Sequence, residues 1–197
     1  MSHDAPPSAA RSQLVPSPPG SPPDRLWAYL RDRHATVITL THPPCRTSDE
    51  SRRVRAAAGH DVIGAKAVVM MAKVRGQPHR KPWLLVLPGD RQIDVRRVCS
   101  QIDGVKSLRL ATAAELVDAT DGLEPGMIPP LGPPVLPGVR AVLLDAGLLS
   151  YNRVGFNAAT LTRSIVCTIS ELVRLTRANA ILPITTDPPA AASGLQK

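Results

Sequence analysis

The apolar positions of this chain fall mainly into short runs of the kind that form buried strands. Residues 64–74 and 82–87 are almost continuously apolar and are rich in Val, Leu and Met. A short polar connection joins these two runs, which predicts an antiparallel pair of strands. Similar runs with β-branched or apolar residues predict six further strands. They are residues 34–41, 106–110, 140–145, 153–156, 164–168 and 181–184.

Capping residues and helical spacing of apolar positions predict helices between these strands. Thr47 with Glu50 and Thr112 with Glu115 each match a capping box, in which the hydroxyl and the carboxylate bind the first free amides of a helix. The other helices are expected over residues 24–33, 93–102 and 170–178. Strands outnumber helices and often follow one another directly. The predicted fold class is therefore α+β, with a curved, barrel-like, largely antiparallel mixed sheet and flanking helices.

Residues 122–137 follow neither pattern, because their prolines are too dense for a helix or a regular strand. Met127, Ile128 and Leu131 are also too apolar for a solvated linker. One interpretation is a rigid crossover that packs on the core. The other is a rigid binding or catalytic loop between a helix and a strand. The pattern alone leaves both interpretations open.

The length of 197 residues suits one domain, which we expect over residues 24–186. Residues 1–23 and 187–197 are rich in Pro, Ser and Ala and are expected to be disordered tails. The N-terminal tail has no apolar run of the signal-peptide type, and it can serve as a protein-interaction segment. No apolar run is long enough to cross a bilayer, so a cytoplasmic protein without membrane contact is expected.

The formal charge of +8 favours a polyanionic partner such as nucleic acid. An arginine-rich solvated surface is the alternative interpretation. Aromatic residues make up only 3% of the chain, which argues against a stacking platform for single-stranded nucleic acid. The three cysteines are far apart and have no ligand spacing, so no metal is expected. A Cys45–His42 pair would need a third orienting group to act as a nucleophile.

Three features can carry chemistry without a covalent nucleophile or a cofactor. Lys66 begins an apolar strand, where its ammonium can bind a phosphate or simply extend to solvent. The amides of Gly126, Met127 and Ile128 precede two prolines and can polarise an ester carbonyl. Asp145 ends a strand, where its carboxylate can position a water molecule or cap the following turn.

Six blocks of the sequence, in this order and at this spacing, resemble the YbaK/ProX superfamily. The blocks are residues 64–70, 86–94, 108–115, 122–132, 142–145 and 156–158. Members of this superfamily are free-standing relatives of the editing domain of bacterial prolyl-tRNA synthetases. The resemblance implies a trans-editing aminoacyl-tRNA deacylase that hydrolyses the ester of a mischarged tRNA without metal. It also implies tRNA as partner, with an aminoacyl-tRNA synthetase as a further partner and a monomer or homodimer as the assembly.

The resemblance assigns roles to individual residues. The family lysine falls on Lys66, its Gly-x-x-x-Pro loop begins at Gly126, and its strand-end aspartate falls on Asp145. The remaining positions are expected to shape the substrate pocket: Met127, Ile128, Pro129, Pro130, Leu131, Gly132, Asn157 and Ala159.

Two positions depart from the pattern of the superfamily. Leu131 replaces a phenylalanine, and Ala159 replaces a glycine and is expected to resist a positive φ. They support an alternative function, a catalytically weak or inactive module of the same fold that binds tRNA or a synthetase.

Overall fold

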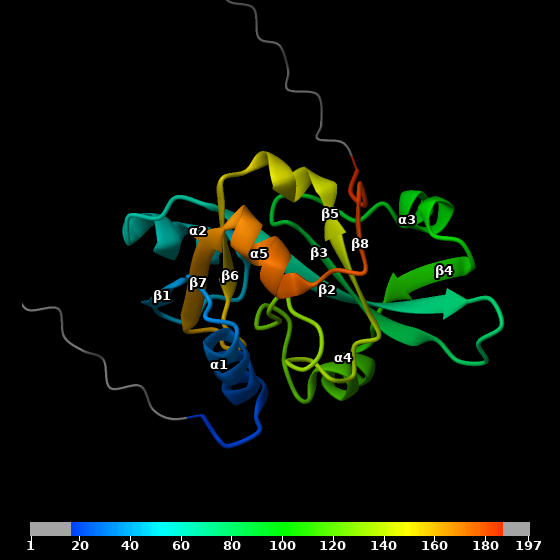
Figure 1. Ribbon diagram of the computed structural model, residues 1–197, viewed down its shortest axis with the longest axis horizontal. Coiled ribbons are helices and arrows are strands. Elements are labelled where there is room, and N and C mark those ends of the chain that lie inside the picture. Colours follow the sequence, from blue (N-terminus) through cyan, green and yellow to red (C-terminus); the bar gives the residue numbers. More distant parts are fainter. Residues whose placement is uncertain (1–16, 187–197) are drawn as a thin grey trace, which may run out of the picture.

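The computed structural model describes residues 17–186, in which eight strands form one mixed sheet (Figure 1). The strands are β1 (Ile38–Thr41), β2 (Ile63–Val74), β3 (Lys81–Pro88), β4 (Val105–Leu110), β5 (Ala141–Asp145), β6 (Arg153–Asn157), β7 (Arg163–Thr168) and β8 (Ala180–Leu182). Their order is β1-β7-β6-β2-β3-β5-β8, and β4 lies beside β2. The pairs β1–β7, β6–β7, β2–β3 and β2–β4 are antiparallel, whereas β2–β6, β3–β5 and β5–β8 are parallel.

Strand β2 joins the two halves of the sheet, and its pairing changes along its length. On one side it pairs with β3 continuously from Ala65 to Ala72. On the other side it pairs with β6 at Ile63 and Gly64 and with β4 only from Met70 onward. Residues 65–69 therefore have a strand partner on one side only. This gap in the sheet positions the site described below.

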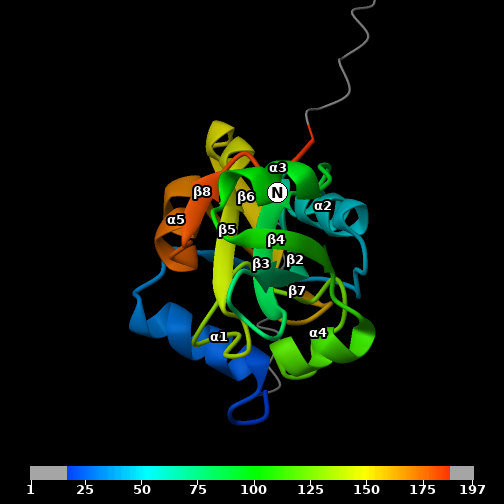
Figure 2. The ribbon, with the colours of Figure 1, turned by 90° about the vertical axis from the view of Figure 1, so that its right-hand side faces the viewer.

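Within residues 17–186, five α-helices and one short 3-10 helix surround the sheet. They are α1 (Pro22–Asp32), α2 (Ser48–Ala57), α3 (Val95–Gln101), α4 (Ala113–Thr120), η1 (Ala146–Ser150) and α5 (Ile169–Thr176). Helices α1 and α4 lie at one end of the molecule and α3 lies at the other (Figures 1 and 2). Both predicted capping boxes are present, at the start of α2 and at the start of α4.

The faces of β2 contribute to two different apolar cores, because successive side chains of a strand point to opposite faces. Ala65 and Val69 belong to the larger core, which α1, α4, α5 and the proline-rich stretch also enter. Met70 and Ala72 belong to the smaller core under α3. Lys66 has the same parity as Met70, so its side chain leaves β2 on the face of the smaller core.

The predicted strands match the structure closely, except that the strand expected over residues 34–41 is limited to Ile38–Thr41. The helix expected from Asp24 begins at Pro22, since proline fits the first turn, where the helix needs no amide donor. The helix expected from Ser170 begins at Ile169, and Thr168 is its N-cap. Apart from residues 17–23, the expected tails lie outside the described residues. None of the helices within residues 17–186 has the length and apolar character needed to span a bilayer.

Residues 122–137 divide into two parts that differ in their packing. The second part is a packed crossover, in which Leu131, Val135 and Leu136 are buried in the larger core. The hydroxyl of Thr176 donates to the carbonyl oxygen of Pro130 at 3.1 Å and fixes this part against α5. The first part, around Gly126, lies at the gap in the sheet.

Candidate active site

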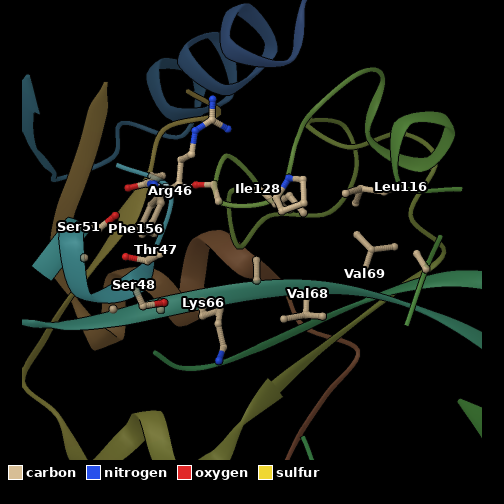
Figure 3. Close-up of a pocket in the computed structure, with 18 of the residues that line it drawn as sticks. Arg46, Thr47, Ser48, Ser51, Lys66, Val68, Val69, Leu116, Ile128 and Phe156 are labelled. Carbon is tan, nitrogen blue, oxygen red and sulfur yellow. Dashed lines mark hydrogen bonds between the residues drawn. The ribbon is translucent and has the colours of Figure 1, made fainter. Parts of the chain in front are cut away.

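A cavity of about 290 Å³ opens at the unpaired edge of β2 (Figure 3). Its walls come from β2, the inward face of α2 and the residues just before this helix, the end of β4, α4, the loop at Gly126 and strand β6. The lining residues are Arg46, Thr47, Ser48, Ser51, Arg55, Gly64, Ala65, Lys66, Ala67, Val68, Val69, Leu110, Ala111, Leu116, Pro125, Gly126, Ile128, Gly155, Phe156 and Asn157. The lining is polar towards α2 and apolar towards β4 and α4. It contains no carboxylate and no imidazole.

The loop at Gly126 closes one side of the cavity. Gly126 has φ +88°, a region that L side chains rarely adopt, and a Cβ atom there would lie 2.8 Å from the carbonyl oxygen of Arg46. Glycine is therefore required at this position for both conformation and space. The amide of Met127 donates to the backbone carbonyl oxygen of Glu124 at 3.1 Å. The expectation that this amide would bind a substrate carbonyl is therefore wrong. No described residue accepts a hydrogen bond from the amides of Gly126 and Ile128.

A chain of side-chain contacts from β6 and β7 holds this loop in place. Asn157 Nδ2 donates to the carbonyl oxygen of Gly126 at 2.6 Å. The buried hydroxyl of Ser164 donates to Asn157 Oδ1 at 3.1 Å, and it lies 2.8 Å from His42 Nε2. The position of the Gly126 loop is thus tied to strands β6 and β7.

Asn157→Asp is expected to lower the rate of the ester hydrolysis implied by the resemblance about tenfold, because it sets a carboxylate oxygen against the carbonyl of Gly126 and releases the loop. The rate of ester hydrolysis and the thermal midpoint should be measured together. Asn152→Asp, a change of the same charge at an exposed position, serves as control. An unchanged rate in Asn157→Asp would show that this contact does not position the loop.

Lys66 lines the cavity along the edge of β2, but its ammonium does not point at the Gly126 loop. Nζ donates to the carbonyl oxygens of Arg91 at 2.8 Å and Gly89 at 3.4 Å. Figure 3 shows the side chain leaving β2 on the side away from Ile128. Burial lowers the pKa of Lys66, and nearby Asp90 partly opposes this shift. The lysine therefore lies at the rim, on the face opposite the loop.

Several residues predicted for the pocket lie in the core instead. Pro129, Pro130, Leu131 and Gly132 are buried, and none of them lines the cavity. Leu131 packs in the larger core, so it does not determine the size of the pocket. Ala159 is also buried there and adopts φ +56°, which corrects the expectation that alanine would resist this conformation. The tight turn between β6 and β7 imposes this angle, and burial of the methyl group offsets part of its strain.

Asp145 lies outside the cavity and has a structural role. Its carboxylate is 1% exposed and accepts from the amide of Gly147 at 2.7 Å and from the amide of Ile184 at 2.9 Å. It therefore caps η1 and anchors the chain after β8. Of the two roles that the sequence allowed, the structure shows the capping role.

Cys45 and His42 approach each other, but they do not form a catalytic pair at the cavity. The sulfur lies 3.6 Å from His42 Nδ1 and donates to the carbonyl oxygen of Pro43 at 3.3 Å. Burial raises the pKa of the Cys45 thiol and Glu50 raises it further, whereas Arg55 opposes the shift. Both main effects disfavour a thiolate. Within the described residues no group of three or more His, Cys, Asp or Glu side chains could hold a metal ion.

Sequence reasoning missed the contribution of α2, above all that of Arg55. Ser51 and Arg55 are one helical turn apart and are the buried residues of this helix. The capping box at Thr47 had already fixed where the helix begins. The sequence did contain a signal for this contribution. The inward face of α2 carries Ser51 and Arg55 at positions where an amphipathic helix normally has apolar residues.

Comparison with known proteins identifies the class to which this fold and cavity belong. The family model of the aminoacyl-tRNA editing domain matches residues 42–175, which include every residue that lines the cavity. The chain therefore belongs to the aminoacyl-tRNA editing domain family. The resemblance predicted from the sequence blocks is confirmed.

Individual relatives agree with this assignment. The chain is 28% identical over 151 residues to the multifunctional Ser/Thr-tRNA deacylase ProXp-y of Escherichia coli K12, a match that covers 77% of this chain and 86% of the relative. The crystal structure of the hypothetical protein APE2540 has a TM-score of 0.67 at 22% identity and covers 82% of this chain and 99% of its own. A candidate trans-editing enzyme for prolyl-tRNA synthetase has a TM-score of 0.63 at 24% identity and covers 84% and 98%. These structures share the fold and confirm the predicted fold class.

Proposed function

We propose that the protein is an aminoacyl-tRNA deacylase, which hydrolyses in trans the ester between a wrong amino acid and the terminal adenosine of a tRNA. Family membership and the deacylase relative support this class of activity. The observation that carries the proposal is the Gly126 loop, whose two unpartnered amides belong to residues that line the cavity. The cavity of about 290 Å³ is near the lower end of the range for ligand sites, ~300 Å³.

The lining indicates catalysis by polarisation. The amides of Gly126 and Ile128 would donate to the ester carbonyl oxygen and stabilise the negative charge that develops as water attacks. The hydroxyls of Thr47, Ser48 and Ser51 lie in the same cavity and can orient the water. Because the lining residues supply no side-chain base, the adjacent ribose hydroxyl of the substrate would assist the proton transfer. This last role comes from the resemblance to the superfamily.

The tRNA would approach from the rim of the cavity. Arg46 lies at the rim with an exposed side chain, and the formal net charge of +8 favours the phosphates. We place the activity in the cytoplasm, where tRNA is charged. A synthetase partner and a homodimer are further proposals, which gel filtration with and without a synthetase would test.

Incubation with a panel of mischarged tRNAs tests the activity itself. We expect release of at least one amino acid at a rate above that of spontaneous hydrolysis. If no member of the panel is deacylated, the enzymatic function is excluded.

Lys66→Ala is expected to lower kcat/KM about tenfold, because the variant loses a positive charge beside the cavity that attracts the phosphates of the tRNA 3′ end, even though its ammonium also donates to two backbone carbonyls. The effect should shrink as salt is raised. Lys73→Ala is the matched control, since Lys73 lies on the same strand and also donates to two backbone carbonyls, those of Gln77 and Pro78. Equal rates for the two variants would show that Lys66 does not contribute to substrate binding.

One observation favours a second function, a binding module without turnover: the cavity lining contains no carboxylate and no imidazole. Such a module would bind aminoacyl-tRNA in a salt-sensitive manner and protect its ester from hydrolysis. The deacylation panel separates the two functions, because a protein that binds without turnover slows the spontaneous release of the amino acid.

A further inference from the structure

Arg55 is a buried cation at the polar end of the cavity. Arg55 is only 1% exposed and lines the cavity from the inward face of α2. The guanidinium lies against two glycines, where a Cβ atom would be 2.5 Å from Nε at Gly155 and 3.4 Å from Nη2 at Gly64. Gly155 has no positive φ. Its lack of a side chain therefore serves to make room for the arginine.

The donors of this guanidinium are largely unused. Nε is buried and has no hydrogen-bond partner, and Nη1 donates only to Ser164 Oγ at the long distance of 3.5 Å. No carboxylate within residues 17–186 forms an ion pair with it. Burial lowers the pKa of Arg55 to about 10, so the side chain remains charged at neutral pH. An uncompensated buried cation is unfavourable, and a ligand that supplies an acceptor would remove this penalty.

The chemistry of an aminoacyl-tRNA restricts which group can reach Arg55. The phosphates are internal to a chain that must leave the cavity, whereas the amino acid is its free end. The α-amino group is a donor and, when charged, a cation, so it is repelled by a guanidinium, which can only donate. The acceptor that can go deepest is an oxygen on the side chain of the amino acid.

We propose that Arg55 is a specificity-determining residue, which binds a side-chain oxygen of the mischarged amino acid and thereby selects hydroxyl or carboxylate side chains over aliphatic ones of equal size. This inference rests on the proposed deacylase function. An aliphatic side chain leaves the guanidinium without an acceptor, whereas a hydroxyl or carboxylate satisfies it.

Matched pairs of substrates test the inference directly. Seryl-tRNA and alanyl-tRNA differ mainly by one side-chain oxygen, and so do threonyl-tRNA and valyl-tRNA. A tRNA charged with Asp tests a carboxylate side chain. We expect the wild-type protein to prefer the oxygen-bearing member of each pair by about tenfold or more. Arg55→Met should abolish the preference by slowing the oxygen-bearing substrates and leaving Ala and Val nearly unchanged. Arg53→Met, an exposed position on the same helix, should retain the wild-type preference.

Each outcome bears on a different part of the argument. If the wild-type protein hydrolyses none of the substrates, the proposed function fails. If it hydrolyses both members of each pair equally, or if Arg55→Met slows all substrates alike, the proposed specificity is wrong. If Arg55→Met does not fold, Arg55→Lys replaces it in the test. This variant keeps the positive charge but loses the planar guanidinium, so we expect a reduced preference for substrates with a side-chain oxygen.

A binding measurement gives an independent readout. Calorimetry with non-hydrolysable seryl and alanyl amides of 3′-amino-3′-deoxyadenosine should show tighter binding of the seryl compound to the wild-type protein. Equal affinities would contradict the inference even if hydrolysis is slow.

Discussion

Gly126→Ala is expected to lower the rate of deacylation at least about 100-fold, because it displaces the amides that would stabilise the developing negative charge. Two effects act together at this position. Alanine is strained at φ +88°, and its methyl carbon would lie 2.8 Å from the carbonyl oxygen of Arg46. The loop must therefore move away from Arg46, which lies just before α2. Single-turnover deacylation measures the loss, and a thermal melt shows that the domain remains folded.

Gly122→Ala is a matched control for this variant. Gly122 has a similar φ of +93°, but a Cβ atom there would have no neighbour within 4 Å. It carries the same backbone strain without displacing the loop, so a small loss of stability and a nearly unchanged rate are expected. If both variants lose activity equally, backbone strain rather than loop position explains the loss.

Much of the fold could be predicted from local signals. The capping boxes at Thr47 and Thr112 located two helix starts, because side-chain and backbone hydrogen bonds within one turn determine them. The apolar runs located the strands, since burial of both faces requires apolar residues at consecutive positions. The antiparallel pairing of β2 with β3 followed from their short connection.

The site was less predictable, because it depends on which side of an element a residue faces. Lys66 was expected to contribute its ammonium to the site, but parity along β2 sends its side chain to the face opposite the Gly126 loop. Leu131 lies only five residues after Gly126, yet the chain has already entered the core there. Arg55 escaped notice because arginine on a helix is normally solvated. Only the tertiary structure shows the two glycines that accommodate it.

The gap between β4 and β6 explains why these residues form one site. A continuous sheet would pair the edge of β2 at residues 65–69, whereas here that edge becomes the floor of a cavity. The Gly126 loop covers the gap on the face of the larger core, and Asn157 and Ser164 connect the loop to the strands beside it. The loop, Arg55 and the edge of β2 are thus positioned by one local feature of the sheet.

Asp145→Ala is expected to destabilise the domain by about 3 kcal/mol, because it leaves the amides of Gly147 and Ile184 without their acceptor. For a domain of this size that loss lowers the thermal midpoint by roughly 10 °C. Deacylation measured well below the midpoint should be nearly unchanged, since the carboxylate is sealed away from the cavity.

Asp118→Ala, which removes an exposed carboxylate from α4, should change neither stability nor rate and controls for the loss of charge. The opposite pattern for Asp145→Ala, a full loss of turnover at unchanged stability, would return Asp145 to the catalytic role implied by the resemblance. Because the two roles predict effects on different measurements, this one variant decides between a carboxylate that holds β5 and β8 together and one that acts on the substrate.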